Sequence, residues 1–321
     1  MTAPAPQRPS TPVGTSAPQP SLEERPRVSG TVWTALAIVY VLWGSTYLAI
    51  RIVLETLPSF LSAGSRSLVA GLLLLGLVAW RQGGSAIRVT RRQLGSAALV
   101  GLLLLTGGNG LVVLGENSIP SGLAALLVAV VPLWMVLLPL AFGGRRPHPA
   151  ALGGVLLGLA GLAVLSWPAL GGDVAPAGVI AVVAATLTWA AGSFAAGRIA
   201  MPPNAFAAAA YQMIAGGLAG LLVGLARGEQ HGFELSQVST RSWLALAYLV
   251  VFGSLVAFTA YAWLLQSAPL TLVSTYAYVN PVVAVLLGWL VLAEPLTGPI
   301  LCGGAIVVAA VCLVVSTARR G

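Results

Sequence analysis

The sequence predicts an all-α integral membrane protein in which ten transmembrane helices form two inverted five-helix repeats. Three observations lead to this fold class: the composition, the number of long apolar runs, and the recurrence of features of the first half in the second. Of the 321 residues, 58% are hydrophobic and only 7% are charged, whereas soluble domains carry about 25% charged residues. We expect a chain of this composition to fold within a lipid bilayer.

Residues 1–30 differ in kind from the rest of the chain. Prolines recur among Ser, Thr and Ala residues, and there is no apolar run, which is typical of disorder. The segment also lacks the apolar core of a signal peptide, so we expect the first membrane helix to direct insertion. The sequence therefore predicts a disordered, Pro-rich cytoplasmic tail ahead of the first span.

Ten apolar runs follow the tail, and we expect each to form one membrane-spanning helix. A helix needs about 20 apolar residues to cross the hydrocarbon core of a bilayer. The connections between the runs are short, apart from 226–241. The expected spans are 32–53, 60–80, 95–115, 120–142, 150–167, 176–199, 205–225, 242–266, 269–292 and 297–317.

The arginines predict the orientation of these spans. The net charge of +8 would suggest a nucleic-acid partner in a soluble protein, but here the basic residues lie in the connections, so we expect no nucleic-acid partner. Arg-rich connections alternate with Arg-poor ones, and cytoplasmic loops collect the basic residues. The Ala-, Gly- and Arg-rich composition fits a bacterial genome of high GC content. We predict a multi-pass bacterial inner-membrane protein with both termini in the cytoplasm.

The second half of the chain repeats features of the first at a shift of about 145 to 149 residues. Because each half contains five spans, an odd number, the second copy must enter the membrane from the opposite side. Two inverted halves, 32–167 and 176–317, are a common design of secondary transporters, which bind substrate near the midplane between the halves. The corresponding features are Gly44-Ser45 and Gly192-Ser193, Pro58 and Pro203, Ala70-Gly71 and Ala215-Gly216, Ser118 and Ser267, Pro120 and Pro269, and Pro132 and Pro281.

Four stretches carry a more specific pattern: WGSTYLAIRIVLE (43–55), AGSRSLVAGLLLL (63–75), GGNGLVVLGENSIPSGLAALLVAVVPLW (107–134) and TYAYVNPVVAVLLG (275–288). They resemble the EamA family of the drug/metabolite transporter superfamily, and its exporter-type members most closely. The resemblance implies a transporter of two EamA units that exports small metabolites, amino acids or drugs. One position departs from the family pattern, because Gly144 stands where the first unit often carries a glutamate, so no role is carried over for that acid.

Pro132 and Pro281 are the expected hinges. Each lies near the middle of a span, where proline lacks an N–H and clashes with the carbonyl four residues earlier, here those of Val128 and Ala277. Backbone groups left unpaired at this depth require contact with protein or with a wet cavity. We therefore expect both prolines to lie at the level of the substrate site.

Polar and aromatic side chains inside the spans are the candidates for a substrate cavity. Arg66 is notable because a charged side chain at the membrane centre costs on the order of 2.5–3.5 kcal/mol. It either lies at the interface with Glu116 or Glu55 as counter-ion, or binds a substrate carboxylate. Asn109, among three glycines, fits cavity lining and interhelical hydrogen bonding equally well. The candidate cavity residues are Trp43, Tyr47, Arg66, Asn109, Trp189, Tyr211, Phe258, Tyr261, Tyr276 and Asn280.

Glu116, at the external end of the third span, is a candidate for proton coupling. A carboxyl that is partly buried there can take up and release a proton, whereas a solvated loop residue would have no such role. Both interpretations stay open at the level of sequence.

The residues favour transport over other functions. The two histidines, His148 and His231, lie in loops on opposite sides, so a clustered metal site is not expected, and no phosphate-binding loop is present. We therefore expect neither an enzyme nor a cofactor. A secondary exporter of small organic molecules that works by alternating access is the favoured function. An importer on the same fold is the first alternative, and a channel and a membrane-embedded enzyme are less favoured ones. Assembly into a homodimer stays open.

Overall fold

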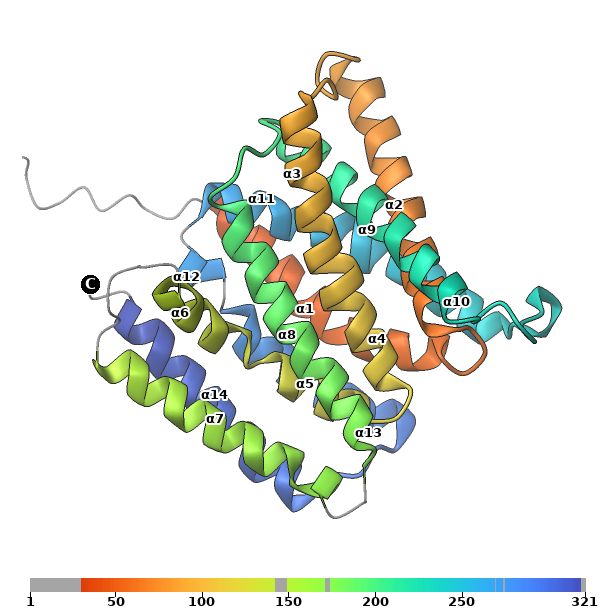
Figure 1. The fold of residues 1–321 in the computed structure, drawn as a ribbon. Helices are drawn as coiled ribbons and strands as arrows, with labels where there is room; N and C mark the ends of the chain where they lie inside the picture. Colours follow the sequence, from red (N-terminus) through yellow and green to blue (C-terminus); the bar gives the residue numbers. More distant parts are fainter. Residues whose placement is uncertain (1–29, 142–148, 171–173, 269, 274, 319–321) are drawn as a thin grey trace, which may run out of the picture.

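The computed structural model describes residues 30–141, 149–170, 174–268, 270–273 and 275–318, and within these ranges it is helical and contains no strand (Figure 1). The predicted tail lies outside the described residues except for Gly30, which begins the first helix, and Gly144 also lies outside them. The all-α character predicted from the sequence is therefore confirmed for the described part of the chain.

Among the described residues, seven helical stretches are long and apolar enough to cross a membrane, judged by length and composition. Several of them are built from successive helical segments. They are α1 (Gly30–Val53), α2 (Ser59–Gln82), α3 with η1 and α4 (Arg91–Gly101, Leu102–Asn109, Gly110–Glu116), α5 with α6 (Ser121–Val128, Val131–Ala141), α8 (Pro176–Ala196), α9 (Ala205–Ala226), and α10 with η3 and α11 (Thr240–Tyr248, Leu249–Phe258, Thr259–Ser267).

The remaining helices contain shorter apolar stretches or are themselves short. The apolar parts Leu152–Leu165, Val279–Leu292 and Gly298–Ala310 fall below the length of the seven spans. They lie in regions where the sequence predicts spans. The helices concerned are α7 (Pro149–Leu170), α13 (Tyr276–Leu292) and α14 (Gly298–Ala318), and the short elements are α12 (Leu270–Val273) and the 3-10 turn η2 (Leu235–Gln237).

Two of the spans change to a π-helix in their middle. The π-helical segments are η1 and η3, and the distance between them along the chain fits the shift of the sequence repeat. A π-helical turn is wider than an α-helical turn and is frequent at functional sites. Asn109, among its three glycines, lies at the end of the π-helix η1, and the helix continues into α4.

The two mid-span prolines lie in different backbone contexts. The span predicted at 120–142 is two helices, because α5 ends at Val128 and α6 begins at Val131, directly before Pro132. Pro132 cannot donate to the carbonyl of Val128 and its ring clashes with it, which accounts for the break. Pro281, in contrast, lies inside the helix α13, so the break at Pro132 is not reproduced at Pro281.

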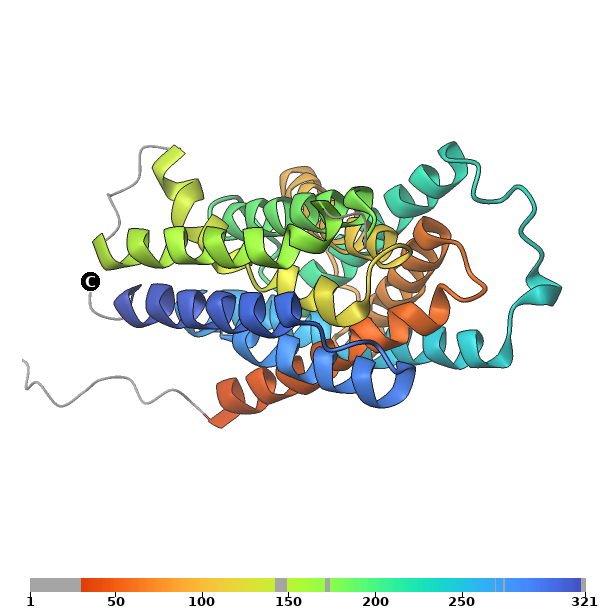
Figure 2. The same ribbon diagram turned by 90° about the horizontal axis from the view of Figure 1, so that it is seen from below.

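Close helix packing holds the bundle together. The most extensive helix contacts are those of α2 with α9 and of α7 with α14. The pair α7 and α14 lies side by side at one edge of the molecule (Figures 1 and 2). Small residues allow the close approach of α2 and α9: a Cβ added to Gly217 would lie only 2.4 Å from the backbone nitrogen of Leu68.

The two halves of the chain are also joined by carboxylates at helix N-termini. Glu229, after α9, accepts hydrogen bonds from the backbone N–H groups of Phe60 (2.9 Å) and Leu61 (3.0 Å) in α2. Glu294, after α13, accepts from the N–H and Oγ of Ser121 (both 2.9 Å) and the N–H of Gly122 (3.1 Å) in α5. Each acid of the second half thus caps a helix of the first half, where a negative charge is favourable.

The first and last of the described helices, α1 and α14, share one end of the bundle (Figure 2). The beginning of α1 and the end of α14 are at one end, opposite the connection between α9 and α10 (Figure 2).

Candidate substrate cavity

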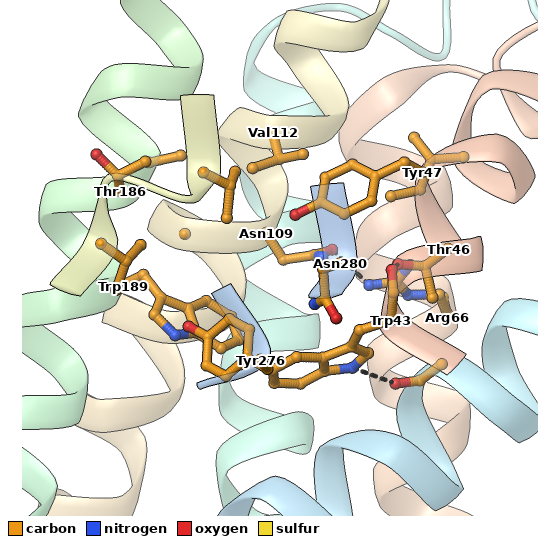
Figure 3. A pocket seen from close by; sticks show the side chains of 16 residues that line it. Trp43, Thr46, Tyr47, Arg66, Asn109, Val112, Thr186, Trp189, Tyr276 and Asn280 are labelled. Atoms are coloured by element: carbon orange, nitrogen blue, oxygen red, sulfur yellow. Dashed lines mark hydrogen bonds between the residues drawn. The ribbon is translucent and has the colours of Figure 1, made fainter. Parts of the chain in front are cut away.

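A small cavity of about 70 Å³ lies between helices from both halves of the chain. Its wall combines aromatic rings, one guanidinium, two amides and aliphatic groups. The lining side chains come from α1, α2, η1, α4, α5, α6, α8 and α13, and the backbone of η3 completes the wall. The polar and aromatic lining residues are Trp43, Thr46, Tyr47, Arg66, Asn109, Thr186, Trp189, Tyr276 and Asn280 (Figure 3).

Arg66 is the one buried arginine of the described residues, with a relative exposure of 5%. One of its terminal nitrogens donates to Oδ1 of Asn109 at 2.5 Å, and its Nε has no hydrogen-bond partner among the described residues. Among the described residues, neither Glu116 nor Glu55 forms an ion pair with Arg66. Glu55 pairs with Arg241 instead, at 3.3 Å. A guanidinium has five N–H donors, so Arg66 retains donors for a ligand at the cavity wall.

Four aromatic side chains form a cluster on one side of the cavity. Trp43, Trp189, Tyr261 and Tyr276 contact one another with ring centroids 4.8 to 5.8 Å apart, mostly in edge-to-face or tilted orientations. Aromatic pairs favour such orientations because the ring edge is positive and the face negative. The cluster joins α1, α8, α11 and α13, and therefore closes the space between the two halves of the chain.

Hydrogen bonds fix the orientation of the rings and of one amide. The indole N–H of Trp43 donates to the carbonyl of Gly253 in η3 at 3.2 Å. The amide nitrogen of Asn280, in the orientation that satisfies its neighbours, donates to the backbone carbonyls of Tyr40 (3.1 Å) and Tyr276 (3.3 Å). Asn280 is thus held against α1, and its Oδ1 remains as an acceptor.

The structure brings seven of the ten predicted cavity residues to the cavity wall. Tyr261 lies behind the wall, where its hydroxyl bonds Ser193 at 2.9 Å and accepts from Trp189. Phe258 is buried in an apolar cluster with residues of α2 and α9, against which the cavity residues Trp43 and Trp189 also pack. The hydroxyl of Tyr211 donates to the carbonyl of Ile87 at 2.6 Å, in the connection after α2. These three residues do not line the cavity.

Glu116 lies outside the cavity lining, at the end of α4. It is completely buried, and neither carboxylate oxygen has a hydrogen-bond partner among the described residues. Its backbone carbonyl accepts from the guanidinium of Arg51. The alternative of a solvated loop residue does not fit this environment.

Sequence reasoning missed several lining residues of ordinary type. Thr46 and Ile50 line the cavity together with Trp43, and Thr186 lines it together with Trp189. Their spacings of three, four and seven residues place them on the same helix faces as the tryptophans. Helical periodicity could therefore have found them, but Thr and Ile carry no chemical signal of their own.

The described residues contain no group of three or more His, Cys, Asp or Glu side chains that could hold a metal ion. The cavity wall also presents no nucleophile paired with a base. The residues of the cavity wall offer hydrogen bonding, charge attraction and aromatic contact to a ligand.

Comparison with known proteins places the chain in a family. The model of the EamA-like transporter family matches it twice, over residues 30–167 and 176–316. The chain belongs to the EamA-like transporter family. The resemblance seen in the sequence is thereby confirmed, and the names of this family and of the relatives indicate a transporter, not an enzyme.

Relatives of this family member are known by name from several organisms. The uncharacterized inner membrane transporter YedA of Escherichia coli strain K12 is 40% identical over 257 residues, covering 79% of this chain and 80% of the relative. A probable terminal-alkyne amino-acid exporter of Streptantibioticus cattleyicolor is 28% identical, covering 90% and 94%. One crystal structure superposes with a TM-score of 0.66 at 22% identity, covering 90% of this chain and 98% of the other. This last likeness concerns the fold alone.

Proposed function

We propose that this EamA-like transporter is a secondary exporter of small metabolites, amino acids or drugs, and that it acts in a bacterial inner membrane by alternating access. Among these substrates we favour zwitterions such as amino acids. The observation that carries the proposal is a cavity between the two halves with the Arg66 guanidinium on one wall and aromatic rings on another. A carboxylate is a strong ligand of a guanidinium, and a protonated amine is attracted to aromatic faces.

The proposed architecture is the one the sequence predicts, ten spans in two inverted repeats, 32–167 and 176–317, with both termini in the cytoplasm. Two matches to one family model and two π-helical segments at corresponding positions support it. In this scheme the halves rock about the cavity. We place the hinges at Pro132, where the span is divided, and at Pro281 beside the cavity residue Asn280.

A solute screen tests the proposed function. Purified protein is heated with amino acids, amines, carboxylates and amphipathic drugs, and solutes that raise the unfolding temperature are then used in counterflow with proteoliposomes. We expect zwitterions to stabilise the wild type and to exchange across the membrane. Arg66→Met is expected to lose stabilisation by zwitterions and carboxylates while its unfolding temperature without ligand is kept. Stabilisation that is equal in both proteins would overturn the proposed role of Arg66.

Direction needs its own measurement, because an importer uses the same architecture. The name of the Streptantibioticus cattleyicolor relative supports export. We expect overproduction of the protein to lower the intracellular accumulation of a transported solute. If accumulation only rises across the panel, the importer alternative takes the place of the exporter.

We also propose that Glu116 couples transport to protons. It is the one fully buried acid of the described residues, and its backbone carbonyl accepts a hydrogen bond from the guanidinium of Arg51. Flux in proteoliposomes should respond to a pH gradient in the wild type and in Glu55→Gln, whose carboxylate is exposed. In Glu116→Gln, counterflow should persist and the response to the gradient should vanish. A response of unchanged size in Glu116→Gln would remove Glu116 from the mechanism.

A further inference from the structure

The two ends of the cavity differ in chemistry. Figure 3 shows Arg66, Thr46 and Asn109 toward one end and Trp189 and Thr186 toward the other. The first end offers the charged donors of the guanidinium. A ligand whose carboxylate pairs with Arg66 therefore directs its remaining groups toward Trp189.

Two polar groups at the Trp189 end, the indole N–H of Trp189 and the hydroxyl of Thr186, are bonded within the protein. The indole N–H of Trp189 donates to the hydroxyl of Tyr261 at 3.2 Å. Oγ1 of Thr186 donates to the carbonyl of Val183 at 2.6 Å and accepts from the indole of Trp134 at 2.8 Å. A polar ligand group placed against these two groups would lose its water without gaining a free partner from them, which is unfavourable. This end of the cavity is therefore suited to an apolar group.

Trp189 has no room to withdraw and enlarge this end. A Cβ added to Gly108, in the π-helical segment η1, would lie 2.7 Å from Cε3 of Trp189, so the indole rests directly on the backbone of this glycine. On other sides the ring contacts Trp43 and Tyr261, with centroids 5.4 and 5.5 Å away. The indole forms a fixed wall of the cavity, and its position depends on residue 108 having no side chain.

We propose that Trp189, seated on Gly108, limits the length of the apolar group that a substrate can bring into the cavity. The inference rests on the proposed function and specifies its substrates: solutes with a carboxylate and a short aliphatic group. The cavity of about 70 Å³ is small beside the roughly 300–1,000 Å³ of typical ligand pockets. A single methylene in a confined apolar pocket changes discrimination by about 10- to 200-fold, so one wall residue is enough to set such a limit.

The test measures affinity against chain length in three variants. Straight-chain α-amino acids from alanine to norleucine, the matching carboxylates and the matching amines are assayed by thermal shift and by competition in counterflow. Trp189→Phe should move the preferred length upward by at least one methylene and improve the longest ligands about tenfold relative to the shortest. Gly108→Ala, which pushes the indole into the cavity, should move the preference downward. Trp167→Phe is the matched control, since Trp167 is 68% exposed on α7, and should leave the ranking unchanged.

The outcomes separate the length limit from the proposed function. If Trp189→Phe ranks the ligands of different chain length in the same order of affinity as the wild type, the inference is overturned, whichever ligand series binds. A ranking that moves for carboxylates or amines while no zwitterion binds supports the length limit and overturns zwitterions as the substrate class. Absence of binding by every series to the wild type overturns both. Elution on size exclusion identifies misfolded variants, and Trp189→Phe alone decides the question if Gly108→Ala does not fold.

Discussion

Gly217→Ala tests the packing that joins the two halves of the transporter. The added Cβ would lie 2.4 Å from the nitrogen and 2.8 Å from the Cα of Leu68, and 2.9 Å from the carbonyl oxygen of Gly64. All three atoms belong to the backbone of α2, so no side-chain rotation relieves the overlap. The helices α2 and α9 must move apart, and their contacts loosen along the length of the pair.

The expected loss of stability follows from two opposing effects. Overpacking of a well-packed interface typically costs about 1–3 kcal/mol, whereas replacing a helical glycine by alanine gains about 0.8–1 kcal/mol where space is free. Gly76→Ala, on α2, isolates the second effect, because nothing lies within 4 Å of a Cβ at that position. The two variants therefore make the same chemical change in different surroundings.

Thermal unfolding of the purified variants, followed by tryptophan fluorescence, distinguishes the two positions. We expect Gly217→Ala to unfold several degrees below the wild type and Gly76→Ala to unfold at or above it. Equal unfolding temperatures for the two variants would refute the close backbone contact between α2 and α9, and with it the arrangement of the halves.

Other predictions concern the cavity and the caps. Trp43→Ala, which removes a ring from the aromatic cluster, and Asn280→Ala, which removes the contact to Tyr40, should both impair transport while folded protein is still present in the membrane. Transport at the wild-type rate by both variants would exclude these residues from the site. Glu294→Gln should lower the stability by about 2 kcal/mol, since hydrogen bonds to charged groups contribute about 1.5–3 kcal/mol each and the amide retains only part of them. Glu55→Gln, which removes an exposed ion pair, should change the stability by less than about 1 kcal/mol, and equal losses in these two glutamine variants would contradict the cap.

The helical spans could be predicted largely from the sequence because long apolar runs have few alternatives in a bilayer. The break in the helix before Pro132 and the continuation of the helix α13 at Pro281 could not be predicted in this way. Both prolines lack the same N–H, so the difference depends on what surrounds each helix. The caps formed by Glu229 and Glu294 were also hidden, because they join residues more than 160 positions apart.

The cavity could be predicted in part from the sequence. Physical reasons account for the three predicted residues that do not line it. Phe258 ends the π-helix η3 and Tyr261 lies in the α-helix α11 that follows it, and the wider turns of the π-helix change the direction of the side chains up to Phe258 relative to a regular α-helix. Tyr211 has the expected aromatic and polar character, yet its hydroxyl bonds a connection at the bundle end. Residue type alone therefore does not decide which polar or aromatic side chains reach the cavity, since Asn109 in the π-helix η1 lines it and Tyr211 in the α-helix α9 does not.

The location of bound substrate tests the central claim most directly. Thr46 lines the cavity, so a cysteine at this position can report whether the cavity is occupied. Thr46→Cys is made in a protein whose exposed Cys302 and Cys312 are replaced by serine. Its reaction with a small maleimide is then measured. The account predicts that a transported zwitterion slows this reaction in a concentration-dependent way and leaves Ser85→Cys, in an exposed connection, unaffected. A transported solute that leaves the reaction of Thr46→Cys unchanged, at concentrations that saturate transport, would contradict the assignment of this cavity as the substrate site.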